Sequence, residues 1–152
     1  MKKSSILSII IIIILLLIIG FFIYERNYKP DYIQIGTSEF EIPNGYQEGK
    51  INKLGDVNLT NGTNSIFLSV KNNTNINKES NSLKEYFENL NETATVQNLT
   101  ISNKPVCKLT VSNDTLSSFY WFENNNEVYY IYNWDGINNM DSIISKFITT
   151  MK

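Results

Sequence analysis

A long apolar run near the N-terminus constrains this chain more than any other feature. Lys2 and Lys3 precede Ile6–Tyr24, nineteen residues in which only Ser8 and Gly20 are not large and apolar. At about 1.5 Å per residue, a helix of this length covers nearly all of the roughly 30 Å hydrocarbon core of a bilayer. A helix also satisfies its own backbone hydrogen bonds in lipid. Residues 1–24 are therefore predicted to be a transmembrane signal-anchor, with lipid-facing side chains that include Ile6, Ile9, Ile14, Leu17, Phe21, Phe22 and Tyr24.

A cleaved secretory signal and a buried core helix are the alternative interpretations of this run. Secretory apolar regions usually span about 7–15 residues and end at small residues, whereas this one is longer and ends in Gly-Phe-Phe-Ile-Tyr. A core helix of a soluble protein ordinarily has a polar face. Two positively charged residues, Lys2 and Lys3, precede the apolar run, and two others, Arg26 and Lys29, follow it. The Lys/Arg rule then predicts, by a narrow margin, an inside N-terminus and an extracytoplasmic C-terminal domain at the cell membrane.

The remainder of the chain is predicted to form a short stalk and one domain. Residues 25–31 are polar and contain Pro30, and residues 32–152 suit a single globular domain. After the first 29 residues the chain has 9 Lys and Arg against 14 Asp and Glu, a net charge of −5. Nucleic-acid binding needs clustered Lys and Arg to neutralise phosphates, so we expect no nucleic-acid partner.

Asparagine is unusually common, with 22 residues. Six of them begin Asn-x-Ser/Thr sequons: Asn58, Asn61, Asn72, Asn91, Asn98 and Asn113. If the domain faces outward in a glycosylating organism, these are possible glycosylation sites, and otherwise they are unmodified polar loop residues.

The single cysteine excludes an internal disulfide. Cys107 shares its strand parity with Leu109 and Val111, so it is predicted to be a small core residue, and a reactive thiol is the alternative.

Period-two alternation of apolar and polar residues predicts most of the domain to be strands. Strands are expected at 32–36, 39–42, 57–59, 66–70, 95–101, 106–112, 116–123 and 128–134, with turns at 43–45, 102–105, 113–114 and 124–126. Ser82 and Glu85 form a capping box that predicts the start of a helix. Its expected apolar stripe is Leu83, Tyr86, Phe87 and Leu90, and that of a second helix is Met140, Ile143, Ile144, Phe147, Ile148 and Met151. The fold class is α+β, an antiparallel sheet with two packed amphipathic helices behind the transmembrane helix.

Residues 38–152 contain the segment Phe40-Glu-Ile-Pro43-x-Gly45-Tyr46, which is similar to the opening F-x-x-P-x-G-aromatic pattern of PsbP-like domains. Further similar segments are Ile66–Val70, Leu83-x-x-Tyr86-Phe87, Tyr120-x-Phe122, Val128-Tyr129-Tyr130-Ile131 and Ile144-x-x-Phe147. The chain also resembles small membrane-anchored proteins of unknown function from methanogenic archaea. The PsbP resemblance implies an α/β/α sandwich on one antiparallel sheet, and a binding or assembly module with no catalytic residue.

The sequence offers little for catalysis, metal binding or cofactor binding. It has no histidine, which removes histidine-dependent triads and zinc sites, and it has no phosphate-binding or calcium-binding loop motif. We therefore predict no catalytic, metal or cofactor site and no enzyme activity. The alternative is a cell-surface hydrolase that uses paired carboxylates, for which the acidic residues at close spacing are Glu39, Glu41, Glu85, Glu88 and Glu92.

Aromatic residues concentrate in the last two predicted strands. Alternate residues of a strand face opposite sides of a sheet, so Tyr120, Trp121, Tyr130 and Trp134 include residues of both faces. If helices cover both faces, these residues belong to the core. If one face is bare, they form a possible binding surface. The predicted partners are the lipid bilayer, through the N-terminal helix, and an envelope protein or glycan.

Overall fold

The chain divides into two compact units, Met1–Asp31 and Tyr32–Lys152, which are described separately. The computed structural model describes the backbone of residues 3–28, 30–112, 116–134 and 136–152. Side chains are described for the same residues except 3–9, 26–28 and 116. The possible glycosylation site Asn113 and the predicted turn at 113–114 lie outside the described residues.

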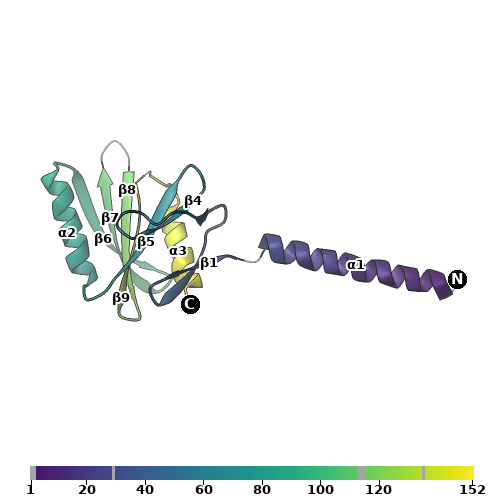
Figure 1. Ribbon diagram of the computed structural model, residues 1–152. Helices are drawn as coiled ribbons and strands as arrows, with labels where there is room; N and C mark the ends of the chain where they lie inside the picture. Colours follow the sequence, from purple (N-terminus) through teal and green to yellow (C-terminus); the bar gives the residue numbers. More distant parts are fainter. Residues whose placement is uncertain (1–2, 29, 113–115, 135) are drawn as a thin grey trace. The chain divides into compact units, whose positions relative to one another are not determined.

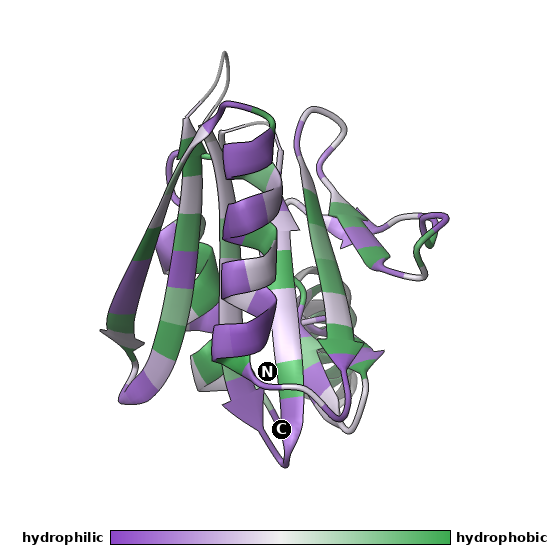
Figure 2. Ribbon diagram, turned by 90° about the vertical axis from the view of Figure 1, so that its left-hand side faces the viewer, coloured by the Kyte–Doolittle hydropathy of each residue, from purple (hydrophilic) through white to green (hydrophobic). Residues whose placement is uncertain are grey.

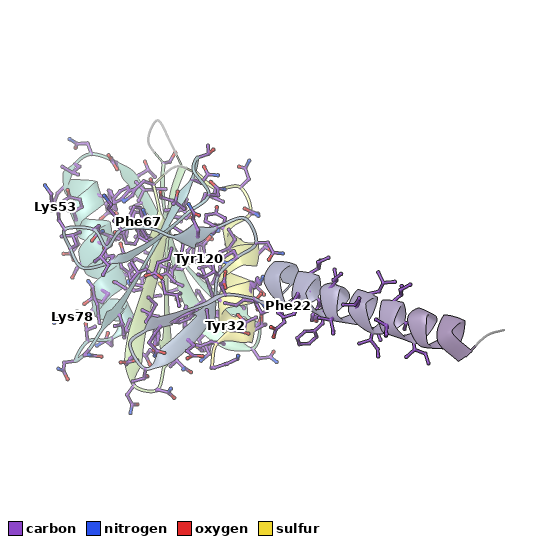
Figure 3. The ribbon with its side chains drawn as sticks, turned by 45° about the vertical axis from the view of Figure 1, so that its right-hand side comes forward. Phe22, Tyr32, Lys53, Phe67, Lys78 and Tyr120 are labelled. Carbon is purple, nitrogen blue, oxygen red and sulfur yellow. The ribbon has the colours of Figure 1, made fainter. Side chains whose placement is uncertain are left out.

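The first unit contains one helix, α1 (Lys3–Tyr28). Its apolar side chains from Ile10 to Tyr24 are all 46–69 % exposed, and Figure 3 shows Phe22 projecting from this helix. The side chains of Ile6 and Ile9 lie outside the described residues. Across the described residues, no helix has the length and apolar character needed to cross a membrane.

The second unit is built on a seven-stranded antiparallel sheet with the strand order β3-β4-β5-β9-β8-β7-β6. Helix α2 (Ile76–Asn89) lies on one face and α3 (Met140–Thr150) on the other, as Figure 1 shows. The strands of this sheet are β3 (Gln47–Glu48), β4 (Val57–Thr60), β5 (Ser65–Lys71), β6 (Thr93–Ile101), β7 (Lys104–Ser112), β8 (Leu116–Asn124) and β9 (Glu127–Asn133).

A second, two-stranded sheet corrects the expectation of one antiparallel sheet. Strands β1 (Tyr32–Ile35) and β2 (Ser38–Glu41) pair only with each other in the described part of the chain. Their turn is fixed to β9, because Glu127 accepts hydrogen bonds from the backbone N–H and the hydroxyl of Thr37, at 2.9 and 2.7 Å. Gly36 adopts φ +58°, a left-handed conformation that glycine adopts without strain, and a Cβ there would lie 2.7 Å from the Glu127 carboxylate.

Strict alternation along the strands produces one core on each face of the main sheet. On the α3 face, Tyr120, Phe122 and Ile131 pack against α3 and against Ile33, Ile35 and Phe40 of the small sheet. On the α2 face, Cys107, Leu109 and Val111 pack with Phe119 and Trp121. Cys107 is buried, which confirms the prediction of a core residue, and burial raises the pKa of its thiol.

Asparagine forms the tight turns of two hairpins. Ser102 and Asn103, between β6 and β7, have φ values of 51° and 63°. Asn125 and Asn126, between β8 and β9, have φ values of 51° and 62°. Two consecutive residues with positive φ make the type I′ turn whose twist matches antiparallel strands, and asparagine tolerates this conformation. These two predicted turns are confirmed.

The start of α2 was predicted wrongly, and so was part of its buried stripe. The helix begins at Ile76, where the side chain of Asn75 accepts a 2.9 Å hydrogen bond from the Lys78 N–H and acts as the N-cap. Ser82, the predicted cap, lies within the helix. Of the predicted stripe only Phe87 is buried, and Leu83 is half-buried, whereas Tyr86 and Leu90 are 56 % and 52 % exposed.

The first turn of α3 is tied to the main sheet through Asp141. Its carboxylate accepts hydrogen bonds from the Tyr120 hydroxyl and from the Lys108 ammonium group, the latter at 2.8 Å. Partial burial acts to raise the pKa of Asp141, but the bonds from Lys108 and Tyr120 outweigh it and hold the pKa below its usual value. Negative charge in the first turn also interacts favourably with the helix dipole.

Asp141→Asn is expected to lower the free energy of unfolding by about 0.5–1 kcal/mol at pH 7. Because the folded state depresses the pKa of Asp141, its stabilising contribution is present above the unfolded pKa of about 3.9 and is lost as pH falls through the folded value. The difference between wild type and variant should therefore vanish near pH 2. Urea unfolding at pH 7 and pH 2 measures it, with Glu85→Gln on the exposed face of α2 as control. An equal difference at both pH values would contradict this account.

Candidate binding surface

Helix α2 covers only part of its face of the main sheet. It packs mainly on β6, β7 and β8, and Figure 2 shows strands on both sides of it, with the outward side of the helix hydrophilic. The part of this face beyond α2 carries Phe67 of β5, Tyr130 and Tyr132 of β9, and Trp134 directly after β9. Phe67 and Tyr130 are half-buried, Tyr132 is only 4 % exposed, and Trp134 is the exposed member. We call these four residues the aromatic surface.

The rings of the aromatic surface contact one another in a continuous row. Tyr132 stacks on Phe67 and on Tyr130 with ring centroids 5.0 and 4.8 Å apart. The register explains this, because Phe67 and Tyr132 are direct cross-strand partners. Trp134 meets Tyr132 edge-on at 5.8 Å. Adjacent strands therefore place side chains far apart in sequence into one apolar strip.

Trp134 is the most accessible member of the row, at 45 % exposure. Its ring rests edge-on against Phe119 at 5.1 Å and Phe87 at 6.2 Å, and its carbonyl accepts a hydrogen bond from the Ser117 hydroxyl. The indole is thus held in place by core residues while nearly half of it is exposed. Tyr86 of α2 and Leu90, the C-cap residue of this helix, are also exposed and lie on either side of Phe87 in sequence.

Polar groups border the other end of the row. The Tyr132 hydroxyl donates a 2.7 Å hydrogen bond to Asp56, whose loop is held by Asn52. Lys71 forms an ion pair with Glu79 of α2 and lies 5.5 Å from the Tyr130 ring centroid. A cavity of about 410 Å³ opens beside these groups and is lined by Asp56, Lys71, the end of β1 and Gly36 directly after it.

The two tyrosines of the row remain neutral phenols at physiological pH. Burial raises the pKa of Tyr130, and the nearby Tyr132, Asp56 and Glu79 raise it further. Burial also raises the pKa of Tyr132, as does its hydrogen bond to Asp56. These phenols can offer ring faces and hydrogen bonds, but neither is poised to act as a base near neutral pH.

The structure separates the four residues predicted as a binding surface. Tyr120 is fully buried on the α3 face, and Trp121 is 1 % exposed beneath the α2 face, so neither belongs to a surface and the prediction is wrong for both. Tyr130 is half-buried and Trp134 is exposed. Figure 3 labels Tyr120 together with Phe67, which projects from the opposite face of the sheet.

The carboxylates singled out for a hydrolase are spread over different elements. Glu41 pairs with Lys146 at 2.7 Å, and Glu88 pairs with Lys84 at 3.3 Å. Glu39 and Glu85 are exposed, and Glu92 is half-buried. Within the described residues, no three carboxylates or thiols gather as ligands for a metal ion.

The described sequon asparagines differ in accessibility. Asn61, Asn72, Asn91 and Asn98 are exposed. Asn58 is half-buried, and its carbonyl oxygen is enclosed without a hydrogen-bond partner. Asn58 is therefore the least accessible of the five for an added glycan.

A solved structure with the same architecture is that of the cyanobacterial PsbP protein (CyanoP) from Synechocystis sp. PCC 6803, in solution. The match has a TM-score of 0.52 at 9 % sequence identity and covers 80 % of this chain and 91 % of that one. The globular unit has a PsbP-like fold. At this identity the likeness concerns the fold alone. No family model matches the sequence, and a comparison with curated proteins finds no match. The resemblance to proteins of methanogenic archaea stays a prediction.

Phe67 and Tyr132 of the aromatic surface, and Asp56 at its polar border, were not among the residues predicted as a binding surface. Alternation along 66–70 places Phe67 opposite Ile66 and Leu68, on the face away from the α3 core. Without the strand order, nothing indicated that Phe67 would meet Tyr132. Asp56 lies in an Asn- and Gly-rich stretch with no periodic signal, and its partner is 76 residues away.

Proposed function

We propose that this protein is a membrane-anchored, non-catalytic binding module whose globular unit faces outward and docks an envelope partner on the aromatic surface. The apolar run Ile6–Tyr24 within helix α1 is the anchor in this proposal. Of the predicted stalk at 25–31, residues 25–28 continue α1. The observation that carries the binding role is the 45 % exposed Trp134 at the end of a supported row of rings.

The anchoring role is supported by the sequence of α1. The nineteen-residue run Ile6–Tyr24 contains no charged residue, and the apolar side chains described between Ile10 and Tyr24 are all exposed. Such a helix in water would expose apolar surface that costs roughly 25 cal/mol per Å². A bilayer removes that cost. The lysines at positions 2 and 3 favour an inside N-terminus.

The binding role is supported by where exposed apolar residues lie. Three apolar side chains, Tyr86, Leu90 and Trp134, are all at least 45 % exposed. The ring of Phe87, which projects from α2, contacts the Trp134 ring. Aromatic side chains that are rigidly held and half exposed are favoured at recognition sites, because binding them costs little conformational entropy. The neutral tyrosines and the separated carboxylates favour recognition over acid–base chemistry.

Outward orientation is tested with the full chain carrying a tag after Lys152. Protease added to intact spheroplasts should remove the tag before lysis. Protection of the tag until lysis would contradict the outward orientation and direct the search to intracellular partners. Carbonate extraction of the same membranes should leave the chain in the pellet, and release into the aqueous fraction would refute the anchor.

Trp134→Ala is expected to weaken binding of the full chain, in detergent, to the insoluble envelope fraction of the source cells by at least about ten-fold, the loss typical of an anchor residue. Co-sedimentation measures it. Tyr32→Ala is the matched control, because Tyr32 is 37 % exposed on β1, outside the aromatic surface. Trp134→Phe, which keeps a ring against Phe119, should retain most of the binding. Equal losses for Trp134→Ala and Tyr32→Ala would contradict the assignment of the surface.

A further inference from the structure

Strand β6 is a long open edge of the main sheet. It pairs with β7 in continuous register over all nine residues, from Thr93 opposite Ser112 to Ile101 opposite Lys104. It is the last strand in the sheet order, and no described strand pairs with its other side. Figure 2 shows β6 at the margin of the sheet, to one side of α2. Its outer backbone N–H and C=O groups are therefore available for pairing.

The other edges of the globular unit are closed or short. Strand β3, at the opposite end of the main sheet, has two residues, one of them Glu48. In the small sheet, Glu39 of β2 exchanges two backbone hydrogen bonds with Lys152, at 3.0 and 3.1 Å. Natural sheets ordinarily protect edges by shortness, charge or a covering segment. Strand β6 departs from this pattern.

The sequence of β6 contains none of the residues that discourage edge pairing. Thr-Ala-Thr-Val-Gln-Asn-Leu-Thr-Ile has no charged residue, no proline and no glycine. It is rich in the β-branched residues that favour strands. Val96, Leu99 and Ile101 are half-buried at this edge, Val96 toward the α2 core and the other two toward the α3 core. A neighbouring strand would bury these three side chains further.

We propose that β6 pairs with β6 of a second copy of this chain, antiparallel, about a two-fold axis near Gln97. Antiparallel pairing of a strand with itself is self-complementary, as an isologous interface requires. The region after residue 29 carries a net charge of −5, so two copies repel across most of their surfaces. The uncharged β6 edge lets them approach without opposing like charges. Pairing over the whole strand would form roughly eight to ten backbone hydrogen bonds.

The geometry of such a pair has a consequence for the aromatic surface. A two-fold axis perpendicular to a continuous sheet keeps corresponding faces on the same side. Both copies of α2 and both copies of Trp134 then lie on one face of a fourteen-stranded sheet, two times the seven strands of one copy. If the proposed binding role is correct, a repetitive envelope ligand would engage both copies and gain avidity. The pairing itself does not depend on that role.

The pairing is tested by Thr95→Lys in the full chain in detergent, with mass measured by light scattering. Thr95 is exposed and lies opposite Thr110 on β7, so the lysine is compatible with the fold, but in the new pair it places a charge opposite the apolar Leu99 of the second copy. The wild type should be dimeric, and the variant's dimer dissociation constant should be at least ten-fold higher. Thr63→Lys, the same substitution at an exposed turn residue between β4 and β5, is the control and should leave the dimer unchanged.

Disulfide trapping in native membranes provides the second measurement. Gln97→Cys should form a covalent dimer under mild oxidation, because Gln97 is exposed near the proposed axis and the native Cys107 is 3 % exposed. Asn81→Cys, on the exposed side of α2, should not form one. A monomeric wild type, or a dimer that Thr95→Lys leaves intact and Gln97→Cys does not trap, would overturn the proposal. The latter result would assign association to another part of the chain.

Discussion

Phe40→Ala is expected to lower the free energy of unfolding of the globular unit by about 3–5 kcal/mol, the range for truncating a buried phenylalanine. Phe40 is fully buried although it belongs to the small sheet. Its ring lies 5.2 Å from that of Tyr129, 5.9 Å from that of Phe147 and 6.4 Å from that of Phe122. One side chain thus joins the small sheet, the main sheet and α3, and its removal leaves a cavity that all three elements border.

Urea unfolding followed by circular dichroism measures this loss, and Phe40→Leu is the control. Leucine keeps most of the apolar volume, so it should cost less than about 1.5 kcal/mol. Loss of the ring should also loosen the C-terminus, because Glu39 of β2 pairs with the Lys152 backbone. Hydrogen exchange at the Glu39 amide that is faster in Phe40→Ala but unchanged in Phe40→Leu would support this link. Equal costs for alanine and leucine would contradict a cavity as the cause.

Local alternation was enough to predict the strands of the main sheet other than β3, because each of these strands has a buried and a less buried side. Every second residue is buried, as shown by Leu109 and Val111 on β7 and by Ile66 and Leu68 on β5. The period of two is a property of the strand itself. Helical spacing of apolar residues, three and four positions apart, correctly predicted α3, whose Ile143, Ile144 and Phe147 are all buried.

Alternation could not predict that β1 and β2 leave the main sheet. Both strands alternate between buried apolar and exposed residues as predicted, with Ile33, Ile35 and Phe40 buried. Their position depends on bonds across the chain, such as that from Thr37 to Glu127, 90 residues away. Nothing in a local pattern encodes such a partner. The short β3 was missed because two residues give no period to detect.

Which aromatic residues reach the surface depended on where α2 lies, and this too is not local. Trp121 has an odd number and Trp134 an even one, yet both lie on the α2 side of the sheet. Odd and even numbers indicate a common face only within one strand, and Trp121 lies within β8 whereas Trp134 follows the end of β9. Helix α2 covers β8 and leaves the end of β9 open. The sequence therefore indicated an aromatic-rich sheet but could not assign exposure within it.

Phe87→Ala is expected to cost about 3–5 kcal/mol of unfolding free energy and to loosen α2 before the rest of the unit. Phe87 is the one large apolar side chain that α2 fully buries, and its ring packs 5.4 Å from that of Phe119. The predicted stripe gave Leu90 the same role, but Leu90 is 52 % exposed. Leu90→Ala should therefore cost less than about 1 kcal/mol.

These two variants separate the observed helix from the predicted one. A stripe that buries both residues requires similar losses, whereas the observed register requires a large loss for Phe87 alone. Hydrogen exchange along 76–89 provides the second readout, because a detached α2 exposes its backbone while the α3 core stays protected. Loss of Phe87 should also weaken envelope binding, since the Trp134 ring rests against it at 6.2 Å. Unchanged binding with a loosened α2 would show that Phe119 alone is sufficient to hold the indole.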